Sequence, residues 1–72
     1  MIQLICEGDC LYTPRSAILL KMHDAGYCDT IKWPDYDASD LRSALYDARE
    51  TGCIPADTKD VLLPDETVFE IE

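Results

Sequence analysis

Four residues in the first half of the chain have the types and the spacing of zinc ligands. They are Cys6, Cys10, His23 and Cys28, separated by three, twelve and four residues. Three thiolates and an imidazole can close a tetrahedral shell around Zn²⁺. The first pair would flank a turn, and the second pair would lie near the end of a helix. The sequence therefore allows a zinc-stabilised protein-interaction module.

This spacing resembles that of a classical zinc finger, over about a third of the chain. Pro14 stands where the finger has a core aromatic residue, and the following segment lacks the basic residues with which a finger reads DNA. The other interpretation is that the cysteines are ordinary thiols, which are small enough to fill gaps in a core. That interpretation needs no cofactor.

The second constellation is acidic. Fifteen Asp and Glu residues against six Lys and Arg give a formal net charge of −9, and residues 34–72 hold eleven of the acids with three of the bases. Carboxylates spread over one face can imitate phosphates and occupy a basic groove built for nucleic acid. The other interpretation is a solvated surface that only confers solubility. The predicted partner-binding residues are Asp35, Tyr36, Asp37, Asp40, Asp47, Glu50, Asp57, Asp60, Asp65 and Glu66.

In size and charge the chain is similar to phage-encoded host-takeover proteins, among them anti-CRISPR proteins and other nucleic-acid-mimicking inhibitors. The resemblance implies a non-enzymatic inhibitor or adaptor that docks on the basic, nucleic-acid-binding surface of a partner protein. A negative field of this size repels phosphates and anionic lipids. We therefore expect neither direct nucleic-acid binding nor membrane binding.

No catalytic constellation is recognisable in the sequence. His23 is the single histidine, and it lies five residues before Cys28, a spacing that does not place a base beside a nucleophile on one helical face. There is no glycine-rich phosphate loop and no H-E-x-x-H site. We expect that the protein is not an enzyme.

The sequence also suggests a compartment. The N-terminus lacks a basic segment followed by a long apolar one, and the longest apolar run is residues 17–20. We expect a cytoplasmic protein, in which cysteines are thiols or metal ligands.

The clearest secondary-structure signal is a helix over about residues 38–51. Apolar residues recur at three- and four-residue steps from Leu41 to Ala48, Asp37 or Ser39 can cap the first turn, and Gly52 can end the helix. The acidic residues Asp40, Asp47 and Glu50 fall opposite that apolar stripe.

A second helix is predicted over about residues 14–25. Thr13 would be its cap, Pro14 its first residue and Gly26 its end. Residues 2–6 and 67–72 have the composition of strands. The expected fold is a single compact acidic α+β domain, residues 1–72, with two helices packed on a short sheet that includes the N- and C-terminal strands. Such a small chain buries only about 60% of its unfolded surface, so both a monomer and a homodimer remain open.

Overall fold

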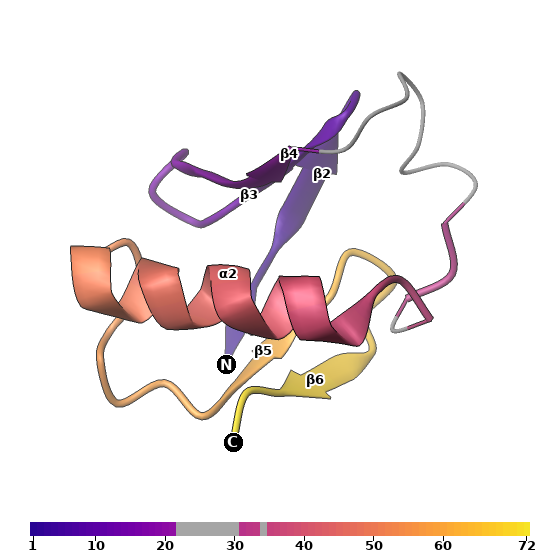
Figure 1. Ribbon diagram of the computed structural model, residues 1–72. Helices are drawn as coiled ribbons and strands as arrows, with labels where there is room; N and C mark the ends of the chain where they lie inside the picture. Colours follow the sequence, from indigo (N-terminus) through magenta and orange to yellow (C-terminus); the bar gives the residue numbers. More distant parts are fainter. Residues whose placement is uncertain (22–30, 34) are drawn as a thin grey trace.

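The described part of the chain forms one α-helix and six short strands in two sheets. The structure is a computed structural model, and it describes residues 1–21, 31–33 and 35–72. The elements are β1 (Ile2–Gln3), β2 (Ile5–Glu7), β3 (Cys10–Tyr12), β4 (Ile18–Lys21), α2 (Ala38–Thr51), β5 (Asp60–Leu62) and β6 (Val68–Glu70). In the view of Figure 1, α2 lies across the strands, with β3 and β4 above it and β6 below. The α+β class is confirmed.

Helix α2 has the bounds and the caps that its sequence predicts. The side chain of Asp37 accepts hydrogen bonds from the backbone N–H groups of Ser39 and Asp40, at 3.2 and 3.3 Å. Gly52 ends the helix in the left-handed conformation, with φ of 84°. Only glycine adopts that conformation without a steric cost from Cβ, so the end of the helix is encoded locally.

The N-terminal segment contributes one strand to each sheet. Strand β1 pairs in parallel with β5, and β6 pairs antiparallel with β5, so one sheet contains both terminal strands as predicted. Strand β2 instead pairs antiparallel with β3 in the second sheet. Between them the backbone N–H of Leu4 donates to the carbonyl oxygen of Leu62 at 2.8 Å. The extended segment of residues 2–7 therefore joins two sheets where the sequence predicted one.

The helix predicted over residues 14–25 is wrong over its described part. Residues 13–17 form a turn, and β4 follows and pairs antiparallel with β3. Pro14 gave a misleading signal, because its fixed φ suits the second position of a β-turn as well as the first turn of a helix. The apolar run of β4 then pairs with a neighbouring strand rather than coiling. Residues 22–25 lie outside the described residues.

The β3–β4 connection has a recognisable geometry. The backbone N–H of Thr13 donates to the carbonyl oxygen of Ala17 at 2.9 Å, and the N–H of Ser16 donates to the carbonyl oxygen of Thr13 at 2.9 Å. Ser16 has a φ of 63°, in the left-handed region. This pattern is a type I turn with proline at its second position, followed by a left-handed residue that bulges the hairpin.

The β5–β6 connection repeats this geometry fifty residues later. The N–H of Leu63 donates to the carbonyl oxygen of Thr67 at 2.7 Å, and the N–H of Glu66 donates to that of Leu63 at 2.8 Å. Pro64 follows the first turn residue, and Glu66 has a φ of 70°. The two turns are thus equivalent in structure, although their residues share little beyond the proline.

We expect Ser16→Gly and Glu66→Gly each to raise the free energy of unfolding by about 0.5–1 kcal/mol. A left-handed conformation costs an L-residue about 1–2 kcal/mol, and the flexibility of glycine in the unfolded chain offsets part of that gain. Urea denaturation measures the effect. Ser16→Ala and Glu66→Ala are the matched controls, since they keep the Cβ, and glycine variants no more stable than these would contradict the prediction.

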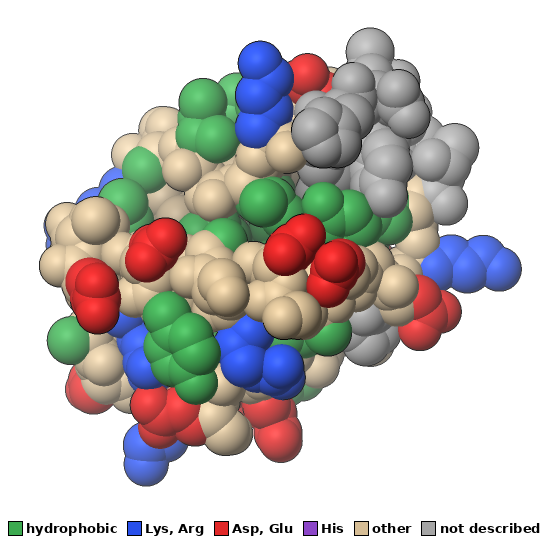
Figure 2. Space-filling model, in the orientation of Figure 1, with side chains coloured by type: hydrophobic (Ala, Val, Ile, Leu, Met, Phe, Trp, Pro, Cys, Tyr) green, Lys and Arg blue, Asp and Glu red, His purple; other side chains and the backbone are tan. Residues whose placement is uncertain are grey.

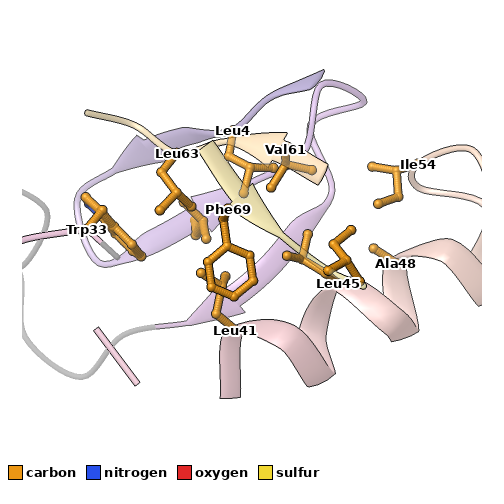
Figure 3. Close-up of a cluster of buried hydrophobic side chains, with 11 residues drawn as sticks. Leu4, Trp33, Leu41, Leu45, Ala48, Ile54, Val61, Leu63 and Phe69 are labelled. Carbon is orange, nitrogen blue, oxygen red and sulfur yellow. The ribbon is translucent and has the colours of Figure 1, made fainter. Parts of the chain in front are cut away.

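One hydrophobic core connects the helix to both sheets. Its buried residues are Leu4, Leu11, Trp33, Leu41, Leu45, Ala48, Ile54, Val61, Leu63, Phe69 and Ile71. Figure 3 shows Leu41 and Leu45 pointing from α2 toward the ring of Phe69, with Val61 of β5 and Leu4, which lies between β1 and β2, beyond it. The inner face of α2 is therefore packed into the core, and this packing fixes the position of the outward face.

Candidate protein-binding surface on helix α2

Three carboxylates form an acidic row along the outward face of α2. Asp40, Asp47 and Glu50 are all exposed, whereas the buried residues of the helix lie on its other side. Because an α-helix rises 1.5 Å per residue, the row extends over about 15 Å. Figure 2 shows Asp and Glu side chains following the helix across the face that is drawn. The sequence predicted these three residues to share a face, and the structure brings them together.

The cations of α2 are turned away from the acidic row. Arg42 donates through Nη2 to the backbone carbonyl oxygen of Glu70 at 3.3 Å. Its guanidinium carbon lies 5.2 Å from the centre of the Phe69 ring, a cation–π distance. Arg42 is therefore directed toward β6.

Arg49 is directed toward the C-terminal segment as well. Its Nη1 donates to the carbonyl oxygen of Thr58 at 2.8 Å and pairs with the carboxylate of Glu72 at 2.9 Å. Its guanidinium carbon lies 4.9 Å from the centre of the Tyr46 ring. Among the residues that the structure describes, this is the one ion pair. No ion pair among the described residues therefore involves the acidic row.

Tyr46 completes a set of helix side chains that covers the last strand. Its hydroxyl donates to the carbonyl oxygen of Ile71 at 3.3 Å. Strand β6 is an edge strand, since the sheet order is β1-β5-β6. Exposed edges invite pairing with other chains. Arg42 and Tyr46 bond to the carbonyl groups of residues 70 and 71 and so occupy acceptors near that edge. No pattern in the sequence predicted this role.

Two of the predicted partner-binding carboxylates instead stabilise local structure. Asp37 caps α2, as described above. Asp65 accepts hydrogen bonds from the backbone N–H of Thr67, at 3.0 Å, and from its hydroxyl. These bonds hold the pKa of Asp65 below its ordinary value. Its contribution to stability is therefore present above the unfolded-state pKa, about 3.9, and is lost as the pH falls through the folded-state pKa.

The other predicted residues lie at scattered places around the helix. Asp35 is exposed before α2, and the ring of Tyr36 lies 5.5 Å from that of the buried Trp33. Asp57 and half-buried Asp60 line a hollow beside the N-terminus. Glu66 is the exposed left-handed residue of the β5–β6 turn. The structure does not gather these five residues with the acidic row into one continuous group.

The first two candidate zinc ligands lie on neighbouring strands but on different faces. In the β2–β3 pair, Cys6 is opposite Leu11 and Cys10 is opposite Glu7. Because side chains alternate along a strand, the two sulfurs project to opposite sides of the hairpin. Cys6 is also disulfide-bonded. His23 and Cys28 lie outside the described residues.

The described residues contain no group of three or more His, Cys, Asp or Glu that could hold a metal. Cys10 is a buried free thiol whose Sγ donates to the Asp9 carboxylate at 3.4 Å. Burial and this carboxylate raise the pKa of the Cys10 thiol. A raised pKa keeps the thiol protonated, and metals and electrophiles react with the thiolate. The zinc interpretation remains a prediction.

A groove between α2 and the β3–β4 hairpin was not anticipated. Its lining includes Thr13, Ile18 and Leu19 from the hairpin side, and Ala44, Asp47, Ala48, Thr51 and Cys53 from the helix side. We call it the helix–hairpin groove. Figure 2 shows hydrophobic side chains gathered above the carboxylates of the helix. The sequence analysis did not predict this groove, because residues 14–25 were predicted as a helix rather than as part of a hairpin.

A comparison of the chain with protein-family models, with curated proteins and with solved structures finds no match. No helix within residues 1–21, 31–33 and 35–72 is both long and apolar enough to cross a membrane.

Proposed function

We propose that this protein is a non-enzymatic inhibitor or adaptor that acts in the cytoplasm. Its acidic row docks on the basic, nucleic-acid-binding surface of a partner protein. In this role it would act as a nucleic-acid mimic, as phage-encoded anti-CRISPR and other host-takeover proteins of similar size and charge do. The partner is a protein, with neither nucleic acid nor membrane bound directly.

The observation that supports this proposal is the direction of the two arginines of α2. Arg42 and Arg49 bond to Glu70 and Glu72 of the C-terminal segment. Neither arginine therefore neutralises a carboxylate of the acidic row. The carboxylates also stand on a capped helix anchored in the core. A row that is ordered before binding loses little conformational entropy when a partner docks, and this favours affinity.

The test compares two double variants with the same net charge. Asp40→Asn/Asp47→Asn alters the acidic row, and Glu7→Gln/Glu70→Gln alters two exposed residues outside it. Proteins retained at low salt on the immobilised wild-type chain supply the partner. We expect the row variant to bind it about ten- to a hundredfold more weakly at low ionic strength, because charge-assisted contacts are lost.

Two further measurements complete this test. Binding of the wild-type protein should weaken steeply as salt is added, and nucleic acid should compete with it for the partner. Equal affinities of the two double variants, or a complex indifferent to salt, would count against docking through the acidic row.

The zinc-stabilised module with Cys6, Cys10, His23 and Cys28 as ligands is the alternative proposal. A native mass spectrum with and without a chelator distinguishes the two. A zinc-containing mass that changes to unfolded charge states on chelation supports the module, since such domains fold only with their metal. An unchanged metal-free mass supports the acidic binder. The same spectrum shows whether the protein is a monomer or a homodimer.

A further inference from the structure

The helix–hairpin groove exposes apolar surface that the acidic row does not use. Ile18, on edge strand β4, is 61% exposed although it is a large aliphatic residue. The groove has a volume of about 240 Å³. Pockets for small-molecule ligands usually measure about 300–1,000 Å³. A hollow of this size is better matched to one or two side chains of a partner protein.

The groove and the acidic row share a residue. Asp47 lines the groove and is also the middle member of the row, with Asp40 and Glu50 on either side of it along α2. The helix wall of the groove therefore carries one carboxylate beside the small side chains of Ala44 and Ala48, while Ile18 and Leu19 on the opposite wall are apolar. A ligand that satisfies both walls has an apolar face directly beside a basic one.

The spacing of the carboxylates favours a helical ligand. Asp40 and Asp47 are seven residues apart, which is two helical turns or about 10 Å. A helix lying along α2 can present lysine or arginine at the same seven-residue interval, as in coiled coils, and keep its apolar stripe to one side. A strand covers about 10 Å in three residues, and residues three apart on a strand point to opposite faces.

We propose that the helix–hairpin groove binds the apolar stripe of a basic amphipathic helix in the partner protein, while the acidic row binds the flanking basic residues. Ile18 and Ala44 contact the apolar stripe, and Asp47 contacts both parts. This inference deepens the proposed function and rests on it. The binding mode is that of an amphipathic helix laid in a groove.

The probe is a synthetic helical peptide of leucine, lysine and alanine, of about 18 residues or five turns, with its leucines on one stripe. It is titrated into ¹⁵N-labelled protein. We expect the amide signals of Ile18, Ala44, Asp47 and Thr51 to shift. Ile18→Asp should weaken binding about tenfold, because an apolar contact is lost. Since this substitution adds a negative charge, electrostatic attraction alone predicts the opposite change.

Val68→Asp is the matched control. Val68 is 50% exposed on β6, outside the groove, and the substitution changes the net charge equally. Its affinity for the peptide should be no weaker than that of the wild type. Ile18→Ala, which only shortens the side chain, should give a smaller loss in the same direction as Ile18→Asp. Thermal melts and dispersed amide signals verify that each variant is folded.

The outcomes separate this inference from the proposed function. In one outcome, Ile18→Asp binds the peptide as tightly as Val68→Asp does while Asp40→Asn/Asp47→Asn binds it more weakly. That result would contradict binding in the groove and would support docking through the acidic row. Amide shifts confined to residues outside the groove would also contradict binding in the groove. A peptide with the same composition but scattered leucines should bind at least about tenfold more weakly, and equal binding would overturn the groove.

Discussion

Leu45→Ala is expected to lower the free energy of unfolding by about 2–5 kcal/mol, because it leaves a cavity in the core that the neighbouring side chains fill only in part. Leu45 is completely buried in the middle of α2. It lies in the cluster that includes Phe69 and Val61, so the substitution loosens the helix from the sheet that contains both terminal strands. For a chain of this size the loss is a large part of the total stability.

Urea denaturation of the two proteins at neutral pH measures this loss. Leu45→Met is the matched control, because it conserves the volume at the same position and should cost less than about 1.5 kcal/mol. An alanine variant as stable as the methionine variant would show that α2 is not anchored by this side chain. The acidic row would then lack the packed support that the proposed function requires.

Reduction of the protein is expected to lower the melting temperature by roughly 10–30 °C. Cys6 is disulfide-bonded, and a disulfide typically contributes about 2–4 kcal/mol by restricting the unfolded chain. In a domain of 60–100 residues each kcal/mol shifts the melting temperature by about 4–8 °C. Cys10 and Cys53 are free thiols, so the reductant acts through the bond of Cys6.

Thermal melts with and without dithiothreitol test this prediction. Cys6→Ser serves as the control, because it should melt at the lower temperature under both conditions. A wild-type melting temperature that does not respond to the reductant would contradict a stabilising role for this disulfide. It would agree instead with the expectation from sequence that the cysteines of a cytoplasmic protein are thiols.

The structure also changes the roles of individual acidic residues. Asp37 was predicted both as a helix cap and as a partner-binding residue, and the structure confirms the cap. Asp65 was grouped with the other carboxylates from its charge, yet it holds a turn. Their carboxylate oxygens are already hydrogen-bonded within the chain. Asp40, Asp47 and Glu50 have no such bond among the described contacts, and for that reason they carry the proposed docking surface.

The sequence by itself determined helix α2 and the acidic row on it. Asp37 and Gly52 mark the ends of the helix through bonds and dihedral angles within a few residues, and the apolar period fixes which side is buried. The positions of Asp40, Asp47 and Glu50 follow from that same period. Local chemistry sufficed because each of these features depends on residues that are near one another in the chain.

Only the tertiary structure decided how residues 13–21 fold and where the arginines point. Thr13 and Pro14 are compatible with a helix start and with a hairpin turn, and the pairing of β4 with β3 selected the turn. Arg42 and Arg49 extend toward Glu70, Thr58 and Glu72, nine to twenty-eight residues away in sequence. Contacts over such separations depend on how the whole chain packs, and no local pattern of residue types encodes them.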